Sequence, residues 1–152
     1  MTLPAFTECG DLPPGIHPAT LADVAERFGS ATAQRRRVFL RLERLYVLAR
    51  ATGHVARTVV FGSFVTAKPE PNDVDVFFLM ADSFDVSTIS GEAHLLFDHL
   101  AAQAYFGASV FWLRRMAVFD GEKPRYNTGR SRGTGDAEAS LSSFRRRHDR
   151  ER

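Results

Sequence analysis

Residues 59–80 read VVFGSFVTAKPEPNDVDVFFLM, and this stretch decides the fold. The short apolar run Val59 to Phe61 predicts a buried strand, and Val74 to Met80 predicts a second one. Aspartate is depleted in strands, yet Asp73 and Asp75 stand at i and i+2, which puts both carboxylates on one face roughly 7 Å apart. Side by side they repel each other, so their placement indicates a functional site, most simply a magnesium ion held by both carboxylates.

Gly62 and Ser63 follow the first strand directly. A glycine here lets the backbone turn sharply and approach a ligand, because no Cβ is in the way. Ser63 can then open a short helical turn, whose N–H groups and hydroxyl suit a phosphate. Phosphate donors on one loop and metal ligands on the next strand are the parts that phosphoryl transfer requires, so the stretch predicts a nucleotide site.

The Gly62-Ser63 pair, nine intervening residues and Asp73-x-Asp75 resemble the signature of the polymerase-beta-type nucleotidyltransferase superfamily. More closely, the stretch resembles the small bacterial members of that superfamily, the minimal nucleotidyltransferases and uncharacterised relatives. Those relatives often begin with a segment similar to Leu12 to Pro18. The resemblance implies that Asp73 and Asp75 are catalytic and hold Mg²⁺. It also implies that Gly62 and Ser63 bind a nucleoside triphosphate.

The resemblance covers about residues 12–114 and departs from the family's pattern in two places. Active members carry an arginine-glycine pair soon after the serine. Here that region reads Phe64 to Pro69, so Lys68 is the candidate phosphate cation, with an ordinary solvated lysine as the alternative. Active members also place a third carboxylate on a later strand. The corresponding strand, Ala108 to Leu113, holds no acid, and Ser109 takes about the expected position, which predicts weaker two-metal chemistry.

Two hypotheses about function follow. In the first, the protein binds a nucleoside triphosphate with Mg²⁺ and transfers a nucleotidyl group to a protein or RNA hydroxyl. In the second, it is a catalytically weak or inactive nucleotide-binding or regulatory module, for example of a toxin–antitoxin pair with a partner protein. Retention of Asp73 and Asp75 favours the enzyme, and the missing third acid favours the module, so whether the chain is an enzyme stays open. A plain nucleic-acid binder that uses a basic tail is the least favoured class.

The composition fits one modest domain of 152 residues, with 44% hydrophobic and 25% charged residues, as in soluble globular proteins. No apolar run approaches the length of a membrane span, and no signal peptide is recognisable. The single cysteine, Cys9, allows no internal disulfide, which fits a reducing compartment. We therefore expect a cytoplasmic protein without a membrane partner.

The net charge differs in sign between the first 120 residues and the rest of the chain. Residues 1–120 carry a net charge of −2, whereas residues 121–152 carry +4 and are rich in Gly, Ser and Arg. This pattern predicts an N-terminal arm over residues 1–19, a nucleotidyltransferase-like domain over 20–119 and a flexible, disordered basic tail over 120–152, with a short helix around Ala137 to Arg147. A solvated terminal charge run is the favoured interpretation of the tail, and phosphate contacts to nucleic acid are the alternative.

Helices are expected before and after the two strands along the sequence. Thr20 predicts a cap for a short helix that ends at Gly29, with Asp23 in the capping-box position. A second helix is expected from about Thr32 to Ala51. Its apolar stripe consists of Val38, Leu42, Leu45 and Ala49. Its solvated face is expected to include Arg35, Arg36 and Arg37.

A third helix is expected from Gly91 to about Tyr105, capped by Ser90 and closed by Gly107. The strand at Ala108 follows it, and a further short strand is expected near Met116 to Phe119. Together these elements predict an α+β fold, a nucleotidyltransferase-like mixed β-sheet backed by helices, with the Gly-Ser turn and the aspartates on one edge.

Overall fold

A five-stranded mixed sheet in the order β1-β5-β2-β3-β4 organises the computed structural model, which describes residues 2–116 and 139–142. Strands β2 and β3 are antiparallel, β3 and β4 are parallel, and β5 lies parallel to β2 and antiparallel to β1. The expected α+β fold is therefore confirmed. The strands are β1 (Ile16–Ala19), β2 (Val55–Phe61), β3 (Asp75–Met80), β4 (Ser109–Arg114) and β5 (Ala139–Ser142).

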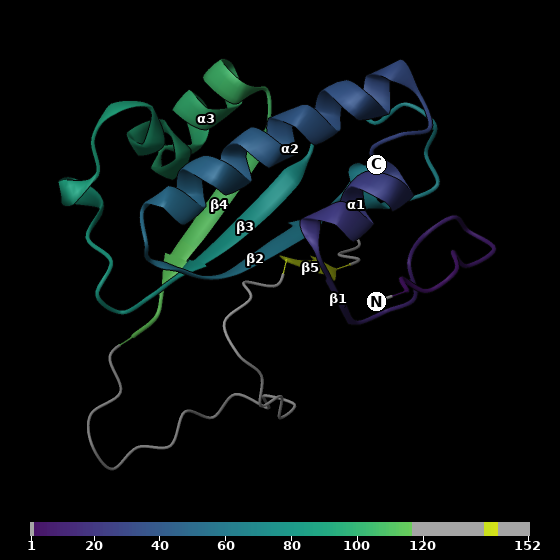
Figure 1. Cartoon of the computed structure of the whole chain (residues 1–152), viewed down its shortest axis with the longest axis horizontal. Coiled ribbons are helices and arrows are strands. Elements are labelled where there is room, and N and C mark those ends of the chain that lie inside the picture. Colours follow the sequence, from purple (N-terminus) through teal and green to yellow (C-terminus); the bar gives the residue numbers. More distant parts are fainter. Residues whose placement is uncertain (1, 117–138, 143–152) are drawn as a thin grey trace, which may run out of the picture.

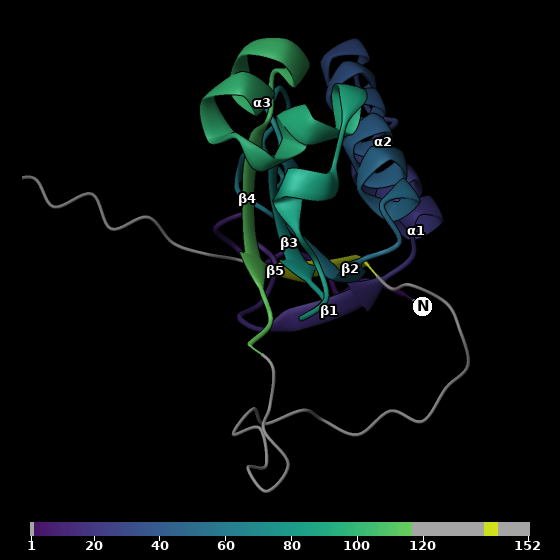
Figure 2. The ribbon, with the colours of Figure 1, turned by 90° about the vertical axis from the view of Figure 1, so that its left-hand side faces the viewer.

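Helices α1 and α2 lie on one face of this sheet, and α2 crosses it diagonally, while α3 packs beside the edge strand β4 (Figures 1 and 2). No helix in the described part of the chain is long and apolar enough to cross a membrane. The α-helices are α1 (Leu21–Phe28), α2 (Ala33–Ala51) and α3 (His99–Phe106), and the 3₁₀ helices are η1 (Ser63–Val65), η2 (Val86–Thr88) and η3 (Gly91–Phe97).

The capping box predicted for the first helix is present. The Thr20 hydroxyl accepts from the backbone N–H of Asp23, and the Asp23 carboxylate accepts from the N–H of Thr20 at 2.8 Å. Gly29 ends this helix as expected. Thr32 caps α2 in the same way, through the N–H of Arg35. Local chemistry alone decides these helix starts, because each cap satisfies N–H groups that the helix leaves unpaired.

One member of the expected solvated face of α2 is buried. The Arg35 side chain is only 5% exposed, so its assignment to a solvated face is wrong. Arg35 stands three residues before Val38 and therefore extends the buried stripe by one turn. The stripe itself, Val38, Leu42, Leu45 and Ala49, is buried as expected.

The third expected helix is broken into two pieces. The 3₁₀ helix η3 ends at Phe97, and a new α-helix starts after Asp98, whose carboxylate accepts from the N–H of Ala101 at 2.9 Å. Ser90 precedes η3 but makes no side-chain cap. Asp98 is a strong N-cap residue, so it favours a helix start inside the stretch where the expected cap at Ser90 and the glycine at Gly107 predicted one continuous helix. Gly107, with φ 64°, closes α3 as expected.

The C-terminal region also differs from the expectation. Residues 139–142 form β5, between β1 and β2, so the expected helix over 137–147 is wrong for these four residues. The further strand expected near Met116 to Phe119 is not formed at Met116, the one residue of that range that the structure describes. Residues 117–119 and the rest of the expected tail lie outside the described residues.

The pleat of β3 divides its side chains between two faces. Val76, Phe78 and Met80 are fully buried against the helices. The alternate residues Asp75, Phe77 and Leu79 are only partly buried and face the other side of the sheet. The strand therefore carries Asp75 onto the side of the sheet opposite α1 and α2.

Candidate functional site

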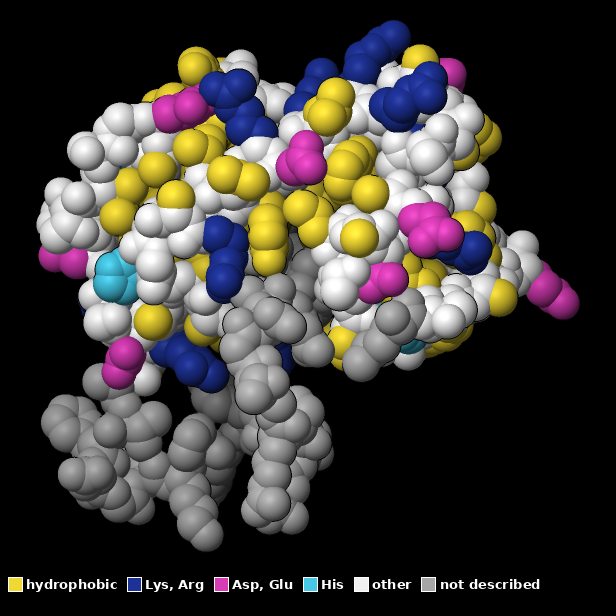
Figure 3. Space-filling model, in the orientation of Figure 1, with side chains coloured by type: hydrophobic (Ala, Val, Ile, Leu, Met, Phe, Trp, Pro, Cys, Tyr) yellow, Lys and Arg dark blue, Asp and Glu magenta, His cyan; other side chains and the backbone are white. Residues whose placement is uncertain are grey.

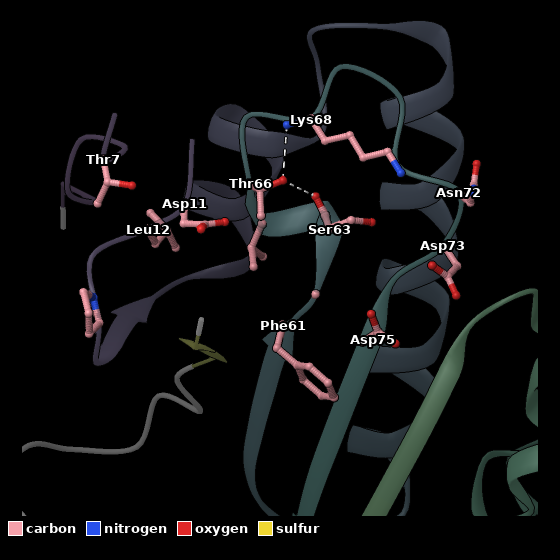
Figure 4. Close-up of a pocket in the computed structure, with 13 residues that line it drawn as sticks. Thr7, Asp11, Leu12, Phe61, Ser63, Thr66, Lys68, Asn72, Asp73 and Asp75 are labelled. Carbon is pink, nitrogen blue, oxygen red and sulfur yellow. Dashed lines mark hydrogen bonds between the residues drawn. The ribbon is translucent and has the colours of Figure 1, made fainter. Parts of the chain in front are cut away.

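A pocket of about 560 Å³ lies where β2 ends and β3 begins. All five residues that the sequence nominated line it, and Figure 4 shows the side chains of Ser63, Lys68, Asp73 and Asp75 around the same hollow. Four of them come from the connection between β2 and β3, and Asp75 is the first residue of β3. The antiparallel pairing of β2 and β3 brings the two ends of this connection together. These residues are Gly62, Ser63, Lys68, Asp73 and Asp75.

Gly62 is required at the turn for two independent reasons. Its φ is +77°, a conformation that side chains other than glycine's rarely adopt. A Cβ at this position would also stand 1.9 Å from Oδ2 of Asp75. The Asp75 carboxylate thus rests directly against the glycine backbone, so the turn and the metal-ligand candidate form one unit.

Ser63 opens the 3₁₀ helix η1, which confirms the short helical turn expected there. The Thr66 hydroxyl donates to the Ser63 carbonyl at 2.8 Å and accepts from the N–H of Lys68 at 3.2 Å. These bonds fix the loop in the shape that carries the Ser63 hydroxyl to the pocket. The Lys68 side chain is exposed and extends toward the side on which Asn72 and Asp73 lie (Figure 4).

Ser109 lies in the same row as the aspartates. The parallel register of β3 and β4 pairs Asp75 with Ser109, and the Ser109 hydroxyl donates to Oδ2 of Asp73 over a long 3.4 Å. Ser109 is 7% exposed. The position at which the sequence lacked a third carboxylate is therefore adjacent to the pair, and an uncharged hydroxyl fills it.

The donor set fits one hard cation. Carboxylate and hydroxyl oxygens are the ligands that Mg²⁺ prefers, and Mg²⁺ usually binds one or two carboxylates, waters and substrate phosphates. Asp73 and Asp75 meet that requirement. Among residues 2–116 and 139–142 no group of three or more His, Cys, Asp or Glu side chains is placed to hold a metal, so the candidate site has two carboxylates and not three.

Arg35, on α2, holds the loop of residues 64–68 by hydrogen bonds to its backbone. Its guanidinium donates to the carbonyl oxygens of Phe28 and Phe64, each at 3.0 Å. It also donates to the carbonyls of Thr66, at 2.7 Å, and Lys68. Burial lowers the pKa of Arg35 from its ordinary value. One buried side chain thus ties α1 and α2 to the 64–68 loop, a role that the sequence analysis missed although position 35 continues the buried stripe of α2.

The N-terminal arm supplies the opposite wall of the pocket, which the sequence analysis also missed. Asp11 and Leu12 line this wall, and Leu12 is only 2% exposed. The N–H of Ala67 donates to the carbonyl of Gly10 at 2.8 Å, which joins the arm to the Ser63–Lys68 loop. Figure 4 shows Asp11 across the hollow from Asp75, so the arm adds a third acidic side chain to the pocket.

The lining carries a net negative charge. Asp11, Asp73 and Asp75 oppose the single cation Lys68, which leaves −2 on the lining residues at neutral pH. A bare polyphosphate would be repelled from such a site, whereas a divalent cation would be attracted and would reverse the sign of the local field. The chemistry that the pocket favours is therefore binding of a cation, or of an anion together with a cation.

No curated protein and no solved structure matches the chain at significant similarity. A family profile does match, and it spans residues 4–152, nearly the whole sequence. The chain therefore belongs to the DUF6932 family, a family of unknown function.

Proposed function

We propose that the pocket binds a nucleoside triphosphate together with Mg²⁺ and that the protein is a nucleotidyltransferase-like protein. The observation that carries this proposal is the packing of the Asp75 carboxylate against the positive-φ turn at Gly62, within one pocket that also holds Ser63 and Asp73. Asp73 and Asp75 would hold the cation. Gly62 and Ser63 would position the phosphates, with Lys68 at the pocket's mouth.

Ser109 bears on whether the protein is an enzyme. Its hydroxyl contacts Asp73 but brings no charge to the row. In-line displacement is favoured when metals clamp both the attacking and the leaving oxygen, and two carboxylates fix fewer metals than three. We therefore expect nucleotide binding with slow or absent transfer to a protein or RNA hydroxyl. A regulatory module, for example of a bacterial toxin–antitoxin pair with a partner protein, is the second candidate.

The location that suits this proposal is the cytoplasm, where Mg²⁺ and nucleoside triphosphates are abundant. The free and exposed thiol of Cys9 is compatible with a reducing compartment.

Thermal denaturation tests the shared cation site. A ligand at a hundred times its Kd stabilises the folded state by about 2.7 kcal/mol, so magnesium with each nucleoside triphosphate should raise the Tm of the wild type by several degrees. Asp75→Asn should lose most of that gain. Asp82→Asn is the matched control, because Asp82 is an exposed acid just beyond the other end of β3. Equal gains in the wild type and in Asp75→Asn would contradict the assignment.

A transfer assay separates the two candidates. The wild type is incubated with α-labelled triphosphate, Mg²⁺ and candidate protein or RNA acceptors, and label on the acceptor is counted. Transfer that disappears in Asp75→Asn and persists in Asp82→Asn would establish the enzyme. Stabilisation by the nucleotide without any transfer would establish the module.

A further inference from the structure

The side of the sheet away from α1 and α2 carries aromatic side chains beside the candidate site. The register places Phe61, Asp75 and Ser109 in one row across β2, β3 and β4. The next row on the same face consists of Val59, Phe77 and Phe111. An aromatic surface thus begins within one row of the carboxylates, about 7 Å along the strands.

Two rings of this surface meet above β3. The centroids of Phe61 and Phe111 are 6.0 Å apart, with the ring planes tilted by 38°. Phe111 is 39% exposed, and Phe61 also lines the pocket. The ring of His99, at the start of α3, lies 4.9 Å from that of Phe111 and extends the surface to the sheet edge. Flat, partly exposed rings of this kind offer stacking contacts to another flat group.

Charge is distributed unevenly along the face. Asp73 and Asp75 lie at one end, whereas the third row pairs Arg57 with Leu79 and Leu113. Arg57 is exposed, and so is Arg115 just beyond β4. Three rows extend about 13 Å along the strands. An extended ligand on this face would therefore meet carboxylates, then aromatic rings, then arginine.

We propose that this face binds the unpaired end of a nucleic-acid strand, with its terminal hydroxyl at the carboxylates, its bases on the Phe61–Phe111 surface and a backbone phosphate near Arg57. Aromatic platforms flanked by cations are the means by which proteins bind single-stranded nucleic acid without sequence preference. The inference rests on the proposed function and names the acceptor of that site. Aromatic rings and arginine also suit a protein partner. The candidate cation site at one end of the face is what favours a strand with a terminal hydroxyl, because a metal ion there would act on that hydroxyl.

The experiment measures binding of a fluorescently labelled, unstructured single-stranded RNA by anisotropy, with the same sequence as a duplex for comparison. The full-length chain is used in the presence of Mg²⁺. Phe111→Ala should weaken single-strand binding by about fivefold or more, since loss of one stacking partner costs on the order of 1–3 kcal/mol. Phe111→Trp should restore it, whereas Phe111→Leu, which keeps the apolar area, should not. Circular dichroism checks that each variant is folded.

Two controls address the opposite face. Leu40→Ala truncates a side chain of α2 that is 60% exposed, and it should leave binding unchanged. Lys and Arg side chains also gather near α2 on the face shown in Figure 3. A double Arg36→Ala, Arg37→Ala variant tests whether simple attraction to these charges explains the binding. Loss of binding in this variant, with normal binding in Phe111→Ala, would overturn the inference.

Other outcomes are equally decisive. Equal affinity for single strand and duplex, or full binding by Phe111→Leu, would show that stacking on this face is not responsible. Absence of RNA binding, with stabilisation by magnesium and nucleotide intact, would refute the inference and leave the proposed function standing. RNA binding that depends on Phe111, without any stabilisation by nucleotide, would support the face as a nucleic-acid surface and refute the proposed nucleotide site.

Discussion

Replacing Arg35 with methionine should destabilise the protein strongly, although the residue stands in a run of three arginines. Methionine keeps an apolar stem of similar length but removes donors to four carbonyl oxygens. The bonds to Phe28 and Phe64 are buried, and each buried acceptor left without a partner costs about 1–3 kcal/mol. For the two acceptors we therefore expect a loss of about 2–6 kcal/mol, which is a large part of the roughly 5–15 kcal/mol that stabilises a typical domain.

Urea unfolding followed by circular dichroism measures this loss directly. Arg36→Met is the matched control, because Arg36 is exposed and its replacement should change stability by about 0.5 kcal/mol or less. Arg35→Lys should fall between the two, since an ammonium has three donors where the guanidinium has five. Near-identical unfolding curves for the position 35 and position 36 variants would refute the view that Arg35 anchors the loop.

Three further changes test the site and the helix start. Gly62→Ala should abolish stabilisation by magnesium and nucleotide, because the new Cβ would displace the Asp75 carboxylate and positive φ adds about 1–2 kcal/mol of strain; a normal thermal shift would contradict this close approach. Ser109→Asp should tighten Mg²⁺ binding in isothermal titration calorimetry, and unchanged affinity would remove Ser109 from the ligand row. Hydrogen bonds from Thr20 lower the pKa of Asp23, so its contribution to stability is present above the ordinary Asp pKa and is lost as the pH falls below about 4. Thr20→Ala should raise that pKa in an NMR titration, and an unmoved midpoint would contradict the capping box.

The features that could be predicted from sequence depend on neighbouring residues. Thr20 satisfies a free N–H group at the start of α1, and Gly62 adopts the positive φ that its turn requires. In both cases the residue type alone predicts the local structure. The apolar runs predicted β2 and β3, and the spacing of Asp73 and Asp75 predicted which acidic side chains would share a pocket.

The features that could not be predicted depend on distant partners. Strand β5 forms because the edges of β1 and β2 supply its hydrogen bonds, and nothing in residues 139–142 alone indicates that pairing. The buried role of Arg35 requires four carbonyls from α1 and from the 64–68 loop, which meet it only in the folded chain. The position of Asp11 opposite Asp75 likewise depends on how the arm returns to the loop.

The loop at the candidate site is held from two sides before any ligand binds. Arg35 fixes its carbonyls from the helix side, and the bond from Ala67 to Gly10 fixes it from the arm. Binding to such a loop requires little ordering of the backbone, so a ligand keeps more of its interaction free energy as affinity. The acidic lining lowers the affinity for an anion that binds without a cation, because Asp11, Asp73 and Asp75 outnumber Lys68. If a triphosphate binds as we propose, the two effects together predict that its affinity depends steeply on Mg²⁺. On the same proposal, the aromatic face beside Asp75 is the neighbouring surface on which an acceptor would lie.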